Sequence, residues 1–282
     1  MIQRSGNLLY MLLLILIGFG FSEKVIPGGK EATTTLQTTI NSKILNQERE
    51  VYIALPESYG TSSNRYPILF TLYNGEAGFT HSSSVISHLY DTQKAPEMIL
   101  ISVSVDGMRD LTPTQTPSYG PTSGGADHFI RFFKEELVPL VEKNYRTTPH
   151  RIFWSHSIGG TLGIYAFLSE SELFFAVLTS SPFFLYDRGD RFLLKNTKQL
   201  LKKRSDSQKN YLYIIIGDEP ELKQQLDEFE RLLKNINPPG LEWDYTQMKS
   251  ETHQSIQSKS LGEGLKALFS KKSRIPGSWH CP

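Results

Sequence analysis

Residues 151–160 read RIFWSHSIGG, a short apolar run that ends at small residues around Ser157. The run over 151–155 has the composition of a buried strand, and the segment behind it, IGGTLGIYAFLS, has that of a helix. Ser157 is therefore expected on a strand-to-helix turn, at the carboxyl end of a parallel strand. Open α/β sheets bind their ligands at that end of their strands.

Other apolar runs along the chain are also typical of strands. Residues 49–56 alternate in polarity, which indicates a half-buried antiparallel strand. A second group is more continuously apolar, as strands covered on both faces are, and comprises residues 66–73, 97–105, 174–181 and 211–217. Residues 241–248 are the last expected strand along the chain.

Two helical patterns lie among these runs. Residues 127–145 carry apolar side chains on one helix face, interrupted only by Pro139, and residues 221–236 repeat the spacing. Strands that alternate with helices predict an α/β fold, with a mostly parallel central sheet flanked by helices on both faces. There is no internal repeat and no low-complexity linker, so we expect residues 23–282 to form a single domain.

The N-terminal residues have the pattern of a secretory leader. Arg4 precedes the apolar run LLYMLLLILIGFGF at 8–21, and Gly20 and Ser22 place small residues at the two positions that a signal peptidase reads. The run is shorter than the roughly 20 residues of a membrane-spanning helix and fits the apolar region of a signal peptide. We therefore expect residues 1–22 to be removed, leaving an exported protein that is periplasmic or secreted. An uncleaved leader, acting as a membrane anchor, is the alternative.

The overall composition narrows the function classes. The 282 residues carry a formal net charge of +1 and no long basic run, so nothing indicates a nucleic-acid partner. The single cysteine, Cys281, cannot form an internal disulfide. No group of cysteines and histidines has metal-ligand spacing. The sequence therefore favours a small-molecule partner over nucleic acid and gives no sign of a metal site.

The turn around Ser157 agrees with the nucleophile-elbow pattern G-x-S-x-G at its central serine and its second glycine. Small residues are needed there because strand and helix approach closely around a strained nucleophile. Ser155 replaces the first glycine, and serine is still small enough for such a turn. The alternative is an ordinary strand-to-helix turn that Ser157 caps.

The candidate base is His253. A serine hydroxyl becomes a good nucleophile only when a base takes its proton, and α/β-hydrolases supply their residues in the order serine, acid, histidine. Of the seven histidines, only His253 lies just after the last expected strand, where a base-bearing loop belongs. A surface loop histidine is the alternative.

The candidate acid lies in the turn after residues 211–217, which reads Asp218-Glu219-Pro220-Glu221. Glu219 is the first choice, because Pro220 should begin the next helix and leave Glu219 in the turn. Asp218 and Glu221 remain alternatives. Any of the three carboxylates could instead serve to stabilise the helix N-terminus.

Acyl transfer also needs preorganised donors for the oxyanion. The N–H of Ile158 directly follows the nucleophile and is the first candidate. The second is the N–H of Glu76, which follows Asn74-Gly75 after the strand at 66–73, where a glycine lets the backbone approach closely. This chemistry uses side chains and backbone amides, so it requires no cofactor.

From about residue 38 to 269 the sequence resembles the putative esterase family of α/β-hydrolases. It is most similar to the branch that includes siderophore (enterochelin-type) trilactone esterases. The stretches that carry the resemblance are SKILNQEREVYIALPESYG, YPILFTLYNG, APEMILISVSVDGMRDLTPT, GGADHFIRFFKEELVPLVEKNYRT, SHSIGG, SSPFFLYDRG and ETHQSI. The resemblance implies an ester hydrolase with Ser157 as nucleophile and His253 as base. In that branch the acid is less uniformly identified, and some members are described as working with a Ser–His pair.

The sequence departs from the family pattern at three places. Ser155 stands where the family usually has glycine, and Asn74-Gly75 stands where it has Asp-Gly. After Ser-Ser-Pro the family tends to carry tryptophans, whereas this chain has Phe183, Phe184, Leu185 and Tyr186. The last departure bears on the wall of a substrate pocket, and so on substrate identity more than on chemistry.

Arg109 is the candidate substrate-binding residue, because it follows the strand at 97–105 and belongs to the same edge of the sheet. It could contact an acidic or catechol-like part of a substrate. The alternative, which we favour, is an ion pair of Arg109 with Asp110 that fixes the loop behind it.

Together these features predict a serine hydrolase that cleaves carboxylic esters through an acyl-enzyme, with a siderophore-type ester as one candidate substrate. An acyltransferase with the same residues is the second hypothesis. The third is a catalytically inactive α/β-hydrolase fold that serves as a binding protein, motivated by Ser155 and by the open choice of acid.

Overall fold

The computed structural model describes residues 24–26, 34–202, 204 and 209–270, and these residues contribute nine strands to one sheet. The expected leader, residues 1–22, lies outside the described residues. The sheet order is β1-β2-β3-β5-β4-β6-β7-β8-β9. The strands are β1 (Lys24–Ile26), β2 (Thr34–Ser42), β3 (Gln47–Leu55), β4 (Tyr66–Leu72), β5 (Ile99–Val103), β6 (Thr147–His156), β7 (Ala176–Ser180), β8 (Asn210–Ile216) and β9 (Leu241–Gln247).

The sheet is antiparallel at one side and parallel over the rest. Strands β1, β2, β3 and β5 pair antiparallel, whereas all pairs from β5 through β4, β6, β7 and β8 to β9 are parallel. This confirms the expected mostly parallel sheet, and the antiparallel pairing of β3 with both neighbours confirms the interpretation of residues 49–56. Strands β5 and β7 are buried at every position, as strands covered on both faces should be.

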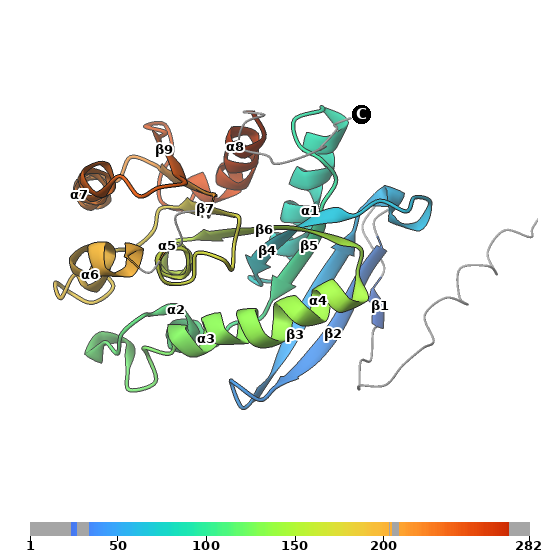
Figure 1. Ribbon diagram of the computed structural model, residues 1–282, viewed down its shortest axis with the longest axis horizontal. Coiled ribbons are helices and arrows are strands. Elements are labelled where there is room, and N and C mark those ends of the chain that lie inside the picture. Colours follow the sequence, from blue (N-terminus) through green and yellow to red (C-terminus); the bar gives the residue numbers. More distant parts are fainter. Residues whose placement is uncertain (1–23, 27–33, 203, 205–208, 271–282) are drawn as a thin grey trace, which may run out of the picture.

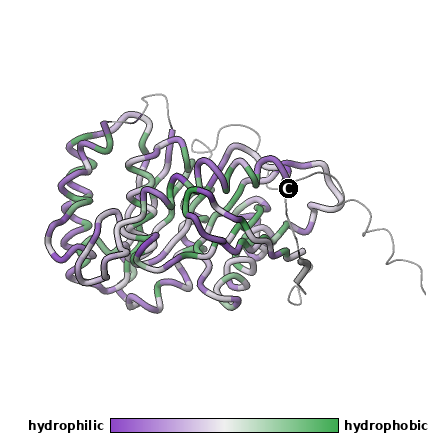
Figure 2. Tube along the Cα trace, turned by 90° about the horizontal axis from the view of Figure 1, so that it is seen from below, coloured by the Kyte–Doolittle hydropathy of each residue, from purple (hydrophilic) through white to green (hydrophobic). Residues whose placement is uncertain are grey.

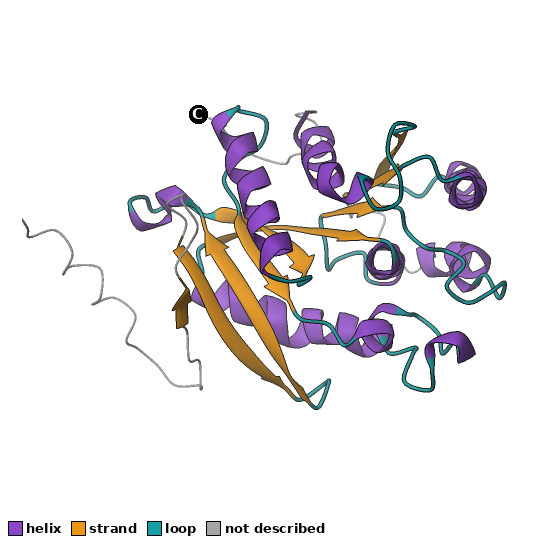
Figure 3. Cartoon of the chain, turned by 180° about the vertical axis from the view of Figure 1, so that it is seen from behind, coloured by secondary structure: helices purple, strands orange, loops and turns teal. Residues whose placement is uncertain are grey.

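Helices cover both faces of the sheet, as expected (Figures 1 and 3). One face carries a hydrophobic core formed with α3, α4, α5, α6 and α7, and the other a core formed with α1 and α8. The helices are α1 (Glu76–Asp91), α2 (Gly107–Leu111), α3 (Ala126–Phe132), α4 (Val138–Asn144), α5 (Ile158–Ser169), α6 (Phe192–Leu201), α7 (Pro220–Ile236) and α8 (Ile256–Ser270), with short 3₁₀ turns η1 (Glu57–Gly60) and η2 (Pro117–Tyr119). In Figure 2 the hydropathy of the chain is mapped onto this arrangement.

The helical pattern expected over residues 127–145 is divided into α3, a π-helical turn at Phe133–Leu137, and α4. Pro139 has no N–H, and its ring would collide with the carbonyl one turn earlier, so the helix widens just before it. Glu136 in the π turn accepts hydrogen bonds from Ser42 Oγ at 2.5 Å and from Lys43 N at 2.9 Å. The turn thereby holds the β2–β3 hairpin against the domain.

Within the described ranges, no helix is long and apolar enough to cross a membrane.

Candidate active site

Ser157 lies on the turn between β6 and α5 with φ 57° and ψ −124°. A non-glycine residue in this region costs about 1–3 kcal/mol and persists only where its surroundings hold it. Here the backbone is held by Ser157 N donating to Ser180 O at 2.9 Å and by Ser157 O accepting from Thr161 N at 3.1 Å and from Phe183 N at 3.3 Å. The strained serine expected of a nucleophile elbow is present.

The elbow accommodates Ser155 because glycines of α5 face it. Ser155 is 2% exposed. A Cβ on Gly159 would lie 3.4 Å from Ser155 Cβ and 2.8 Å from Leu72 Cδ1, and one on Gly163 would lie 3.1 Å from Ser155 Oγ. The helix therefore approaches β6 as closely as backbone allows, and the extra atoms of Ser155 occupy the space that these glycines leave.

Three loops bring Ser157, Glu219 and His253 together. His253 Nε2 lies 3.0 Å from Ser157 Oγ, and His253 Nδ1 lies 2.5 Å from Glu219 Oε1. Ser157 follows β6, Glu219 follows β8, and His253 follows β9, so each side chain comes from the carboxyl end of a parallel strand. This is the edge at which such sheets place their sites.

Of the three candidate acids, Glu219 is the one in contact with His253. Pro220 begins α7, as expected, and leaves Glu219 just outside the helix. Asp218 uses its backbone N–H to donate to Glu251 O at 2.6 Å. Glu221 lies in the first turn of α7.

The surroundings of Glu219 favour its ionised form. Burial raises the pKa of this carboxyl, but hydrogen bonds from Ser181 Oγ (2.5 Å), from His253 and from Gly217 N (3.0 Å) outweigh it, so the pKa lies below its usual value. An ionised carboxylate only accepts hydrogen bonds, so Nδ1 of His253 must carry the proton. Nε2 is then free to accept the proton of Ser157.

Ser181 is a site residue to which sequence reasoning gave no role. It follows β7, is fully buried and has a φ of 46°. Its place at the end of a central strand, beside the strand that carries Ser157, is the signal that could have pointed to it.

His156 also lies beside the candidate base. Its ring centroid is 4.7 Å from that of His253, and its Nδ1 is 2.8 Å from Ser180 Oγ. Burial, together with the nearby His253, lowers the pKa of His156 to about 4. The imidazole next to His253 is therefore neutral at neutral pH.

The two candidate oxyanion donors both begin helices. Ile158 is the first residue of α5, and Glu76 is the first residue of α1, preceded by Gly75 at φ 97°. The first N–H groups of a helix have no partner within it and remain available to a ligand. Strands β4 and β6, which lead into these helices, are parallel neighbours, so both helix N-termini lie at the same edge of the sheet.

Ser157 and His253 open onto a cavity of about 710 Å³. This volume is in the range of small-molecule sites, roughly 300–1,000 Å³. Its lining residues are Met108, Tyr119, Ser157, Ile158, Phe183, Leu185, Glu219, Pro220, Glu221, Leu222, Gln225 and His253.

Arg109 is not among these residues, so the structure does not bring the candidate substrate-binding side chain to Ser157. Its guanidinium donates to Leu45 O at 3.1 Å and to Asp106 Oδ2 at 3.3 Å, because the short helix α2 directs it toward the β2–β3 turn. Asp110 is not its partner either, since that buried carboxylate binds Arg49 at 2.7 Å. Arg109 therefore stabilises its loop by pairing with Asp106, and not with Asp110 as expected.

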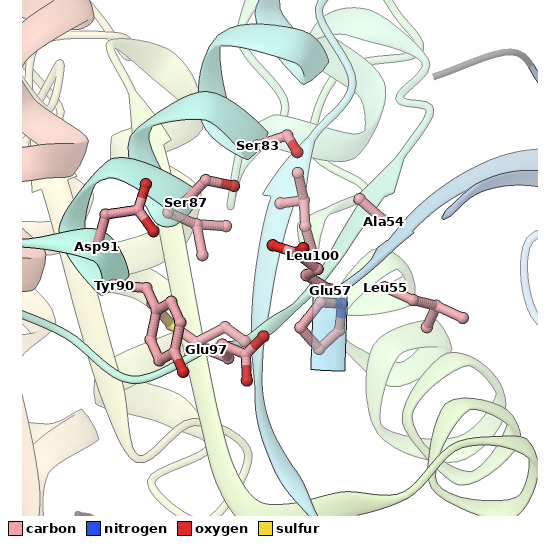
Figure 4. Close-up of a pocket in the computed structure, with 12 residues that line it drawn as sticks. Ala54, Leu55, Glu57, Ser83, Ser87, Tyr90, Asp91, Glu97 and Leu100 are labelled. Atoms are coloured by element: carbon pink, nitrogen blue, oxygen red, sulfur yellow. The ribbon is translucent and has the colours of Figure 1, made fainter. Parts of the chain in front are cut away.

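A second cavity, of about 170 Å³, lies between α1, β3 and β5 (Figure 4). The carboxylates of Glu57, Asp91 and Glu97 surround it, and Glu97 accepts hydrogen bonds from Ser58. None of Ser157, Glu219 and His253 lines this cavity, so it is separate from the candidate site.

The sequence profile of the Putative esterase family matches residues 42–266. The chain belongs to this family. Ferri-bacillibactin esterase BesA of Bacillus subtilis (strain 168) is 26% identical over 144 residues, which make up 48% of this chain and 49% of that relative. The match thus spans about half the length of the curated relative. The resemblance to the esterases noted in the sequence is confirmed.

Two solved structures are similar to this chain over most of its length. An IroE-like serine hydrolase from Shewanella oneidensis is 28% identical, with a TM-score of 0.74 over 84% of this chain and 80% of that one. The siderophore hydrolase EstB from Aspergillus nidulans is 19% identical, with a TM-score of 0.71 over 83% of this chain and 94% of that one. The first comparison confirms the α/β-hydrolase fold, and the second shows a shared fold alone.

Proposed function

We propose that the protein is a carboxylic ester hydrolase that works through an acyl-enzyme on Ser157. The observation that carries the proposal is the unbroken chain of contacts from Ser157 Oγ through His253 to Glu219, at 3.0 Å and 2.5 Å. Membership of the Putative esterase family supports it. A fold kept only for binding would have no need of this arrangement around a strained serine.

In the proposed reaction, His253 Nε2 takes the proton of Ser157 as Oγ attacks the ester carbonyl. The backbone N–H groups of Ile158 and Glu76 stabilise the oxyanion of the tetrahedral intermediate. The intermediate collapses when protonated His253 gives its proton to the leaving alcohol oxygen. Water then enters and attacks the acyl carbonyl while His253 takes its proton, and the acid is released as His253 returns this proton to Ser157 Oγ. Glu219 stabilises the imidazolium in both halves of the reaction.

We propose a small-molecule ester as the substrate. A curated relative is named a ferri-bacillibactin esterase and a fold neighbour a siderophore hydrolase, so siderophore-type esters are one candidate class. A panel of esters that includes a catecholate trilactone tests this choice. Product analysis with and without a competing alcohol separates hydrolysis from acyl transfer, because the two reactions share Ser157 and His253.

The catalytic assignment is tested by labelling the protein with a fluorophosphonate and measuring turnover of a 4-nitrophenyl ester. Ser157→Ala should lose both. Ser258→Ala is the matched control, because this exposed serine donates to Ser255 O, next to its own helix, and does not line the cavity. Full ester hydrolysis by the Ser157→Ala protein would show that the nucleophile lies elsewhere.

We also propose, from residues 1–22, that the protein is exported and its leader removed. The mass of the protein recovered from its native host tests this directly. A mature chain that begins near Glu23 supports export with cleavage. A full-length chain in the membrane fraction would instead support an uncleaved anchor.

A further inference from the structure

The loop after β7 presents alternate side chains to the cavity and to the core. Phe183 and Leu185 line the cavity, whereas Phe184 and Tyr186 are 1% and 0% exposed in the core. Phe183 itself is 36% exposed.

The loop is fixed relative to the nucleophile. Phe183 N donates to Ser157 O at 3.3 Å, and Thr161 Oγ1 donates to Phe183 O at 2.8 Å. The two buried aromatic residues anchor the loop in the core. The ring of Phe184 packs on Phe229, and the hydroxyl of Tyr186 lies 3.1 Å from Thr114 Oγ1. The backbone of Phe183 is therefore held next to that of Ser157, and its exposed side chain lines the same cavity as Ser157.

The rest of the wall is mostly apolar, with the amide of Gln225 and the carboxylate of the exposed Glu221 as its polar groups outside the Ser157–His253–Glu219 contacts. Met108, Tyr119, Ile158, Pro220 and Leu222 add apolar surface. Of the described residues that line the cavity, none is an arginine or a lysine, and the one charged side chain outside the Ser157–His253–Glu219 contacts is the exposed Glu221. An anionic group that entered here would lose water without meeting a cation, and it would face a like charge.

We propose that this cavity binds an uncharged, apolar acyl group and discriminates against anionic esters, with Phe183 and Glu221 as the residues that determine this specificity. The inference rests on the proposed function, because the acyl group is the part bonded to Ser157 Oγ in the acyl-enzyme. An iron-loaded tris-catecholate, which carries a net negative charge, belongs to the disfavoured class. An iron-free, neutral ester belongs to the favoured one.

The test compares two 4-nitrophenyl esters whose acyl groups have the same shape and differ in charge. The 6-methylheptanoate ends in an isopropyl group, and the adipic acid monoester ends in a carboxylate. Near neutral pH we expect kcat/KM to be about tenfold or more higher for the neutral ester. Equal values, or a preference for the adipate, would overturn the proposal.

Two variants of α7 test the role of charge. Glu221→Lys should reduce the ratio of the two kcat/KM values by about threefold or more, because it replaces the rim anion with a cation. Glu230→Lys changes the net charge equally on the same helix, but Glu230 pairs with Lys234 and does not line the cavity. That control should keep the original ratio. An equal effect of both variants would contradict the role of Glu221.

Phe183→Ala tests the apolar wall. It should lower kcat/KM for the 6-methylheptanoate by about tenfold, and lower it less for 4-nitrophenyl acetate, whose acyl group is too short to cover the ring. An equal loss on both esters would mean that Phe183 acts on the nucleophile and not on the acyl group.

The failure of this inference can be told apart from the failure of the proposed function. Turnover of 4-nitrophenyl acetate reports the catalytic machinery alone. Calorimetric titration of the Ser157→Ala protein with the same two longer esters reports the cavity alone. Tighter binding of the neutral ester supports the inference even if no ester is hydrolysed, and equal or reversed affinities overturn it even if the acetate is a good substrate.

Discussion

Ser181 Oγ lies 2.5 Å from one oxygen of Glu219, while the other oxygen of the same carboxylate lies 2.5 Å from His253 Nδ1. The acid is therefore held between the candidate base and a buried serine that was not among the predicted site residues. Because Ser181 is fully buried and donates to a charged group, its hydroxyl orients the carboxylate as well as favouring its ionised form.

Ser181→Ala should lower kcat/KM for a simple ester by about tenfold, since a hydrogen bond to a charged group contributes about 1.5–3 kcal/mol and part of it is needed in the transition state. Steady-state kinetics beside a thermal melt measures this. Ser258→Ala should match the wild-type protein. An Ser181→Ala protein with a wild-type melt and wild-type kcat/KM would rule out a positioning role.

Glu219→Gln should lower kcat by about 10²–10⁴-fold, because the amide keeps the size of the side chain but cannot stabilise the imidazolium. Asp218→Asn is the matched control one residue away, and it should retain kcat within about threefold, as expected of a change remote from the reacting atoms. A larger loss in Asp218→Asn than in Glu219→Gln would show that the acid has been assigned to the wrong residue.

His156 should make stability depend on pH. The pKa of His156 is about 4 in the folded protein, whereas the ordinary pKa of a histidine is 6.5. Between pH 4 and pH 6.5 this imidazole is therefore protonated in the unfolded chain and neutral in the folded protein. Stability should therefore rise with pH across this window, by up to about 3 kcal/mol. Urea unfolding near pH 4.5 and pH 7 measures the change. His156→Gln should flatten it, and an equally steep dependence in this variant would assign the effect to another group.

Gly160→Ala should destabilise the fold by about 1–3 kcal/mol, because the new Cβ would lie 2.3 Å from Thr179 Oγ1 and 3.1 Å from the backbone of Pro182. Gly262→Ala is the matched control within α8, where the nearest atom, Val85 Cγ1, is 3.7 Å away. That variant should be neutral or more stable by up to about 1 kcal/mol. Comparable melting temperatures for the two variants would contradict the close approach of α5 to Thr179 and Pro182.

Much of the fold follows from local sequence pattern. The segment IGGTLGIYAFLS is helix α5 over the same residues, and Pro220 begins α7 because it suits the first turn of a helix. Strand β2 was missed because its sequence, TTLQTTINS, places threonine where an apolar residue would mark the buried face. Helix α1, EAGFTHSSSVISHLYD, was missed for a similar reason, since serines dilute its apolar face.

The site residues also differ in how far the sequence predicts their positions. The positions of Ser157, Glu219 and His253 after β6, β8 and β9 follow from chain order, because the carboxyl ends of parallel strands share one edge. The direction of the Arg109 side chain depends on the turn of the short helix α2 and on Asp106. The contact of Ser181 with Glu219 depends on a positive φ at a buried residue. Neither of these has a periodic signal in sequence.

The central claim is that Ser157 becomes acylated with the help of His253. Its most direct test is rapid mixing with 4-nitrophenyl acetate, followed by mass mapping of the quenched protein. The account predicts a burst close to one equivalent of 4-nitrophenolate, an acetyl group on the peptide that contains Ser157, and no burst in Ser157→Ala or His253→Ala. An acetyl group on another residue, or a burst that survives in Ser157→Ala, would contradict it.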